Sequence, residues 1–268
     1  INPKYENAYY NRGNAKSNSN DYQGAIADYT KVIKINPKYE NAYYNRGLAK
    51  SDLNDYQGAI IDYTKAIEIN PKNAYAYNRR ASAKYDLKDS QGAIIDYTKA
   101  IEINPKFTDA YTFRGWTKYE NGDYYGAISD YNKAIELNPT DSFLYDFRAL
   151  AKFDLEDYKG VISDIDKVIE FNSQPQDLAP SYALGGDAKG KLGDYYGAIS
   201  DYSKAIEINP NDTYSYFYRG NAKYNIGDKK GACKDYKSIS LGDINDESLD
   251  ENTPWEKESA DEWIRKHC

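Results

Sequence analysis

The amino-acid sequence predicts an all-α fold, a right-handed superhelical solenoid of antiparallel helix pairs. The first observation is a repeat, because INPKY at 1–5 returns at 35–39 and INPK returns at 69–72 and 103–106, each 34 residues later. The second is that small and apolar residues recur within each unit at three- and four-residue spacings, as in amphipathic helices. One such helix pair cannot bury its faces alone, so neighbouring pairs must stack.

The repeat divides residues 6–246 into seven units of 34 residues. The units begin at Glu6, Glu40, Ala74, Thr108, Ser142, Ala179 and Thr213. We expect residues 1–5 to be the end of a truncated preceding repeat and residues 176–178 to be an insertion. We expect residues 247–268 to form an acidic linker and a C-terminal capping helix over the last repeat.

Stop and start signals support these boundaries. An Asn-Pro step at positions 31 and 32 of most units ends the second helix, since a residue before Pro avoids helical dihedrals. Residues 171–180 lack this step, and the break there can be a hinge or a tolerated loop insertion. Residues 253–256, TPWE, read as an N-cap, a first-turn Pro and the Glu of a capping box, and Trp255 and Trp263 would cover the last repeat.

The packing positions repeat almost without change. Counted from the first residue of each unit, position 4 is Tyr in all seven, position 8 is Gly or Ala, and positions 20 and 24 are Ala and Tyr in six. Position 32 is Pro in five. This pattern resembles that of the tetratricopeptide repeat family over residues 1–246. The resemblance implies a concave groove, lined by the first helices, that holds peptide ligands.

Charged residues also recur in phase. Position 23 is Asp in all seven units and position 7 is Arg in six. In an antiparallel hairpin these positions lie opposite each other, so we predict interhelical ion pairs, which would be architectural. The pairs of the central units are Arg46 with Asp62, Arg80 with Asp96, and Arg114 with Asp130. The alternative is that the Arg row binds anionic partners, and we expect the Lys at position 11 to be a solvated head over a packed stem.

The composition excludes several classes of function. No apolar run approaches the roughly 18 residues of a membrane span, so we expect a soluble chain, with the compartment open and the cytoplasm favoured. Cys233, Cys268 and His267 are the only Cys and His residues, too few for a four-ligand zinc site or a disulfide framework. With no Gly-rich phosphate loop either, we predict no cofactor, no metal and no enzymatic activity.

Function is expected where the repeats differ, on one stripe of the first helices. We call positions 2, 5, 9, 12 and 13 the inner stripe, because they face away from the packing positions. Its N-terminal part is neutral and rich in Asn, and its middle part is aromatic and acidic. The candidate partner-binding residues are Asn14, Tyr44, Tyr75, Asn78, Asp86, Asp109, Trp116, Tyr119, Glu120, Phe143, Asp146, Phe153 and Asp154. Exposed aromatic side chains at this density mark a partner site, although some rings could instead pack on the next repeat.

These patterns favour a non-catalytic scaffold that binds a peptide segment of another protein. Aromatic and acidic residues suit a segment with apolar anchors and Lys or Arg. We expect no nucleic-acid partner, because the inner stripe lacks the row of Lys and Arg that phosphates need. Two alternatives stay open: a regulatory or targeting array cut from a larger protein whose other domain carries the activity, or an array that self-associates end to end.

Overall fold

The computed structural model describes residues 4–172, 174–239 and 268, and these residues form fourteen α-helices, one 3-10 helix and no strand. Consecutive helices pack in pairs, and the second helix of most pairs packs on the first helix of the next. The predicted all-α repeat solenoid is therefore confirmed. The chain divides into two compact units, Ile1–Asn138 and Pro139–Cys268.

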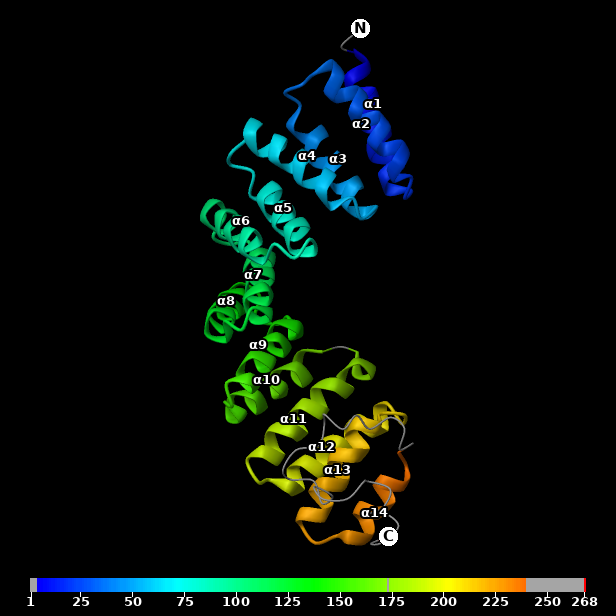
Figure 1. Ribbon diagram of the computed structural model, residues 1–268, viewed down its shortest axis with the longest axis vertical. Helices are drawn as coiled ribbons and strands as arrows, with labels where there is room; N and C mark the ends of the chain where they lie inside the picture. The colour runs from blue at the N-terminus through cyan, green and yellow to red at the C-terminus, as the bar shows by residue number, and fades with distance from the viewer. Residues whose placement is uncertain (1–3, 173, 240–267) are drawn as a thin grey trace. The chain divides into compact units, whose positions relative to one another are not determined.

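The first unit contains four helix pairs (Figure 1). They are α1 Lys4–Asn18 with α2 Tyr22–Ile35, α3 Glu40–Asp52 with α4 Tyr56–Ile69, α5 Ala74–Asp86 with α6 Ser90–Ile103, and α7 Thr108–Glu120 with α8 Tyr124–Leu137. The first helices of neighbouring pairs also touch, α1 with α3, α3 with α5 and α5 with α7. These contacts partly cover the inner stripe of the unit.

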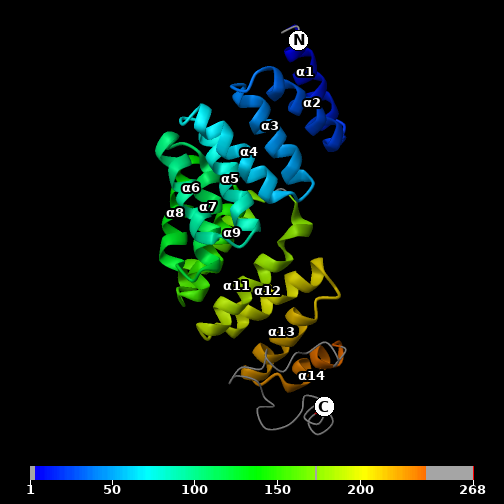
Figure 2. The same ribbon diagram turned by 45° about the horizontal axis from the view of Figure 1, so that its top comes forward.

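The second unit contains three pairs and the break, which Figure 2 shows from another side. Its elements are α9 Ser142–Asp154, α10 Tyr158–Phe171, the 3-10 helix η1 Pro175–Leu178, α11 Ala179–Lys191, α12 Tyr195–Ile208, α13 Thr213–Asn225 and α14 Lys229–Lys237. The break is occupied by η1, which contacts both α11 and α12. Whether this break acts as a hinge stays a prediction.

Each hairpin turn is built from the same three positions. In the second repeat Asn54 adopts the left-handed region with φ 61°, and the side chain of Asp55 caps α4 by accepting a hydrogen bond from the Gly58 amide at 3.0 Å. A Cβ atom at Gly58 would lie 2.1 Å from an Asp55 carboxylate oxygen. The Asp-x-x-Gly spacing is thus a requirement of the cap.

Small residues at position 8 make room for the Tyr at position 24. A Cβ atom at Gly47 would lie 2.7 Å from the ring of Tyr63, whose side chain is fully buried, and Ala59 at position 20 is buried beside it. The same arrangement recurs in the first repeat with Gly13 and Tyr29. This close approach explains the alternation of tiny and large residues in the repeat.

The interhelical ion pairs are present in six repeats. In the second repeat Arg46 donates from Nε and Nη2 to the two oxygens of Asp62, at 2.9 and 2.6 Å, and Asp62 is buried. Arg80 donates likewise to Asp96 at 2.8 and 2.7 Å. Because Arg46 also donates from Nη1 to Thr30 of the preceding pair at 3.0 Å, the network joins neighbouring hairpins.

The expectation for Lys at position 11 is wrong. Lys50 does not extend into solvent but places its ammonium 2.8 Å from Asp62, and Lys84 is at the same distance from Asp96. The physical reason is that position 11 lies one helical turn beyond position 7, on the same face. Arg and Lys therefore converge on one buried carboxylate, which a single cation would neutralise less fully.

The sixth repeat departs from this arrangement because Gly185 occupies the Arg position. Asp201 is left with the ammonium of Lys189 at 2.5 Å, and burial raises the pKa of Asp201. In the first repeat, by contrast, the guanidinium of Arg12 lowers the pKa of Asp28 to about 2. At position 23, the pKa of the Asp is thus lowered in the first repeat, which has Arg12, and raised in the sixth, which has Gly185 in place of Arg.

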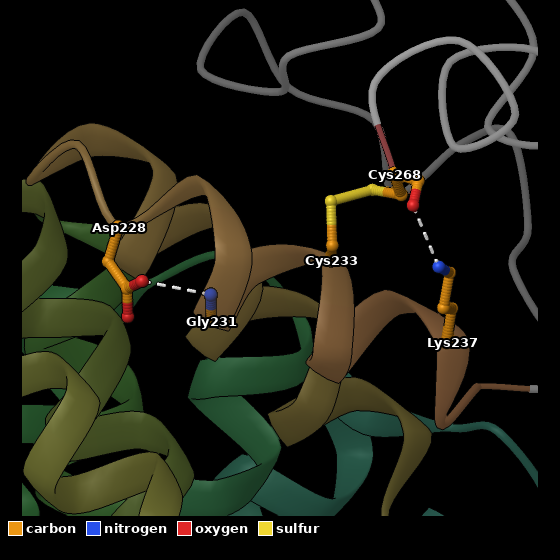
Figure 3. Close-up of a disulfide and its surroundings, with 5 residues drawn as sticks. All are labelled: Asp228, Gly231, Cys233, Lys237 and Cys268. Carbon is orange, nitrogen blue, oxygen red and sulfur yellow. Dashed lines mark hydrogen bonds between the residues drawn. A yellow bond between two sulfur atoms is a disulfide. The ribbon is translucent and has the colours of Figure 1, made fainter.

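A disulfide joins Cys233 of α14 to Cys268, with the Cα atoms 5.4 Å apart (Figure 3). Lys237 donates from Nζ to the Cys268 carbonyl oxygen at 3.0 Å. The cytoplasmic location expected from the sequence stays a prediction. The predicted capping helix, with Trp255 and Trp263, lies outside the described residues.

Candidate functional site

The neutral start of the inner stripe is a closed hydrogen-bond network. Asn14 accepts hydrogen bonds at Oδ1 from the Tyr29 hydroxyl at 2.8 Å and from Asn45 Nδ2 at 3.1 Å. The same Asn45 amide donates to the Tyr10 hydroxyl at 3.0 Å. Asn14 therefore serves the contact between the first two pairs, and its oxygen is already occupied.

The next part of the stripe mixes buried and exposed residues. Tyr44 is half-buried against Tyr63, with ring centroids 5.9 Å apart, and burial raises its pKa. Tyr75 at position 2 is 59% exposed, and its ring lies 4.9 Å from that of Phe107. Asn78 at position 5 is only 3% exposed, which contradicts its expected place on an open groove. The contact between α5 and α7 encloses this position.

An aromatic and acidic cluster joins the third and fourth repeats. The indole of Trp116 donates to the Tyr85 hydroxyl at 2.9 Å, and Tyr85 donates to Glu120 at 2.5 Å. The ring of Tyr119 lies 5.5 Å from Trp116. Trp116 and Tyr119 are half-buried, which agrees with the alternative that some rings of the stripe pack on a neighbouring repeat. The cause is a contact between repeats: Tyr85, at position 12 of the third repeat, pairs with positions 9 and 13 of the fourth, which are Trp116 and Glu120.

The acids of this unit stay at the surface. Asp86, Asp109 and Glu120 are exposed, and they lie on the first helices α5 and α7. The first unit therefore brings together Trp116, Tyr119 and Glu120 from the predicted set, and it presents carboxylates on the same two helices. Such a surface can contact apolar and cationic groups of one ligand.

In the second unit Phe143 at position 2 is 63% exposed, and Asp154 is exposed at the end of α9. Phe153 is half-buried, with its ring edge-on to Tyr158 at 5.4 Å. Asp146 accepts a hydrogen bond from the Ser181 hydroxyl at 3.0 Å, and burial raises the pKa of Asp146.

One further acid on the stripe was not among the predicted site residues. Asp187, at position 9 of the sixth repeat, accepts hydrogen bonds from the hydroxyls of Tyr202 at 2.6 Å and Tyr214 at 2.7 Å. Burial raises the pKa of Asp187 to about 6. The sequence did hold a signal, because Asp187 is the one acid at position 9 in the seven repeats.

The described residues also bear on two other functions, metal binding and membrane spanning. Among them, no group of three or more His, Cys, Asp or Glu side chains is placed to hold a metal ion. Within the same residues, no helix is long and apolar enough to cross a membrane. The buried carboxylates at position 23 are held by Arg and Lys of the scaffold.

Comparison with known proteins agrees with this architecture. The tetratricopeptide repeat profile matches residues 6–39, 40–73, 74–107 and 108–141, and a second profile, TPR repeat, matches residues 186–227. These matches span more than half of the chain. The chain belongs to the tetratricopeptide repeat family. Members of this family are protein-interaction scaffolds, and the chain is one as well.

Solved structures show the same fold. The C-terminal part of a TPR repeat-containing protein from Cytophaga hutchinsonii superposes with a TM-score of 0.75 at 20% identity, over 89% of this chain and 97% of that one. YrrB, described as a TPR protein with an unusual peptide-binding site, gives 0.63 at 21% identity, over 70% and 95%. MamA gives 0.57 at 27% identity, over 59% and 92%. No match was found among curated protein sequences.

Proposed function

We propose that this tetratricopeptide repeat array binds a segment of a partner protein along the inner stripe of its first helices. The observation that carries the proposal is the exposure of aromatic rings at position 2 in both units. Tyr75, Phe143 and Tyr214 are 59%, 63% and 45% exposed. Exposed aromatic residues are the commonest anchors of protein interfaces. They suit a segment with apolar side chains.

The acids of the stripe define the charge of the partner. Asp86, Asp109 and Glu120 are exposed in the first unit, and Asp154 is exposed in the second. Opposite charges across an interface favour the encounter and its register. We infer that the partner segment carries Lys or Arg beside its apolar anchors. The related fold of YrrB, whose printed description includes a peptide-binding site, supports peptide binding by such an array.

A peptide display library tests this proposal. The library would be panned against the wild-type chain and against a variant with Tyr75→Ala and Phe143→Ala, which lacks an exposed position-2 ring in each unit. Tyr125→Ala is the matched control, because Tyr125 is 77% exposed on a second helix and lies off the inner stripe. We expect the double variant alone to lose the selected peptides. Equal recovery on all three proteins would overturn the assignment to the inner stripe.

The role is proposed to be non-catalytic, with no cofactor. A second proposal is end-to-end self-association of the array. Sedimentation at several concentrations tests it, and a constant monomer mass would exclude it.

A further inference from the structure

A pocket of about 760 Å³ opens in the second unit among η1, α11, α12 and the start of α13, which are neighbours in Figures 1 and 2. Its apolar lining includes Pro180, Ala183, Leu184 and Ile208, and its polar lining includes Asp187. The volume lies within the range of roughly 300–1,000 Å³ that is usual for ligand sites. The pocket is therefore large enough for a side chain and the residues that flank it.

The sequence explains why the pocket is open at this repeat. Position 5 carries Ala183, whereas the first, second and seventh repeats carry Tyr10, Tyr44 and Phe217. The insertion adds η1, whose Gln176 contributes to the lining. The pocket thus opens where a small residue on the inner stripe, Ala183, lies beside the extra turn η1.

Asp187 is a carboxylate without a cation of its own. Its oxygens accept hydrogen bonds from Tyr202 and Tyr214, and within residues 174–239 it forms no ion pair. The other titratable groups that act on it are Lys191 on α11 and Asp212 before α13. Asp212 and Asp177 also line the pocket, and the described residues of its lining include no Lys or Arg. The electrostatic character of the pocket is therefore acidic.

The scaffold does not require this negative charge. In the first repeat the Tyr at position 24 donates to the neutral Asn14 at 2.8 Å, and in the seventh repeat Tyr236 donates to the neutral Asn221 at 2.8 Å. A neutral Asn can thus accept the hydrogen bond from the Tyr at position 24 that Asp187 accepts in the sixth repeat. Burial raises the pKa of Asp187 to about 6, so its ionised form is disfavoured in the fold. Charged groups that lower the stability of the fold and are not needed for its structure are typical of functional sites.

We propose that this pocket binds a Lys or Arg side chain of the partner segment, with its cationic head on Asp187 and its aliphatic stem against Pro180, Leu184 and Ile208. The inference rests on the proposed peptide-binding function and names one anchor of it. The stem buries methylene groups on apolar walls while the head replaces water at the carboxylate. Binding is expected to weaken below about pH 6, because Asp187 then takes up a proton.

The test uses the peptide Ala-Leu-Lys-Leu-Ala, amidated at its C-terminus and labelled with fluorescein on its N-terminal amine, measured by anisotropy at pH 7. Its controls replace Lys by norleucine, which keeps the stem without the charge, or by Arg. The proteins are the wild type, Asp187→Asn, Ala183→Phe and Asp166→Asn. Ala183→Phe fills the pocket with the residue that the seventh repeat carries at this position, and Asp166→Asn removes an exposed charge on the second helix α10, off the inner stripe and outside the pocket lining. Circular dichroism verifies that each variant is folded.

We expect the Lys and Arg peptides to bind the wild type and Asp166→Asn at least tenfold more tightly than Asp187→Asn or Ala183→Phe. Equal affinity for the wild type and Asp187→Asn would overturn the inference, as would an equal loss in Asp166→Asn. Butylammonium chloride supplies a free amine. If it binds the wild type and neither the Lys nor the Arg peptide does, the cation is not a side chain of a partner segment, and the inference is contradicted. If library peptides bind the wild type and Asp187→Asn alike, the pocket inference fails while the proposed function stands. If no peptide binds the wild type, both fail.

Discussion

Replacement of Asp130 by Asn is the sharpest test of the ion-pair network. Asp130 is 3% exposed and receives three hydrogen bonds from two cations. Arg114 donates from Nε at 2.9 Å and from Nη2 at 2.6 Å, and Lys118 donates from Nζ at 2.8 Å. An Asn side chain has nearly the same shape but only one acceptor oxygen. Its amide nitrogen would place a hydrogen-bond donor against a cation. Because Asn is neutral, Arg114 and Lys118 would both lose the opposing negative charge.

The expected loss of stability follows from this geometry. Removing one partner of a buried ion pair costs about 3–5 kcal/mol, because a charge stays buried without compensation. The side chains of Arg114 and Lys118 are 15% and 20% exposed, so water reaches both heads. We therefore expect the lower end of the range, a loss of about 3 kcal/mol in the free energy of unfolding.

Urea denaturation followed by far-UV circular dichroism measures the effect. Repeat arrays do not always unfold in one step, so the curves are fitted with intrinsic and nearest-neighbour terms. Asp201→Asn is the matched control, because Asp201 pairs with Lys189 and has no Arg at position 7. We expect that control to lose about 1 kcal/mol or less. An equal loss in the two variants, or no loss in Asp130→Asn, would refute the network's role.

Two other stability predictions follow from single residues. Asp187 has a pKa raised from 3.8 to about 6, so the folded state binds its proton more tightly than the unfolded chain, and stability falls as the pH rises from about 4 to about 6. Asp187→Asn should remove this dependence and add about 3 kcal/mol at pH 7; identical urea midpoints for the two proteins across this range would contradict it. Lys88 and Glu156 adopt positive φ, at 66° and 59°, where three of the other repeats have Gly and two have Asn. Lys88→Gly and Glu156→Gly should each add about 0.5–1 kcal/mol, and a lowered urea midpoint would argue against strain there.

The sequence was sufficient for the fold because its pattern repeats. A Gly or Ala at position 8 and a Tyr at position 24 recur in phase, and the structure packs Gly47 directly on Tyr63. The opposition of positions 7 and 23 follows from the antiparallel hairpin alone. The role of Lys50 did not follow, because the pattern of charges does not say whether a long side chain extends into water or turns toward Asp62.

The candidate site was less predictable because exposure on the inner stripe depends on the neighbouring repeat. Asn78 is buried where α5 meets α7, and Trp116 is tied to Tyr85 of the preceding repeat. Helix periodicity places a residue on a face but does not say how closely the next helix approaches. Asp187 was overlooked because the predicted site followed aromatic density, whereas its pocket arises from a small residue, Ala183, and an insertion.

Panning of the peptide library tests the central claim most directly. The wild-type chain should enrich segments that combine apolar anchors with Lys or Arg, and the Tyr75→Ala, Phe143→Ala variant should lose them while Tyr125→Ala keeps them. That outcome would place the partner site on the inner stripe. Enrichment of acidic segments, or equal recovery on the wild type and the double variant, would contradict the account.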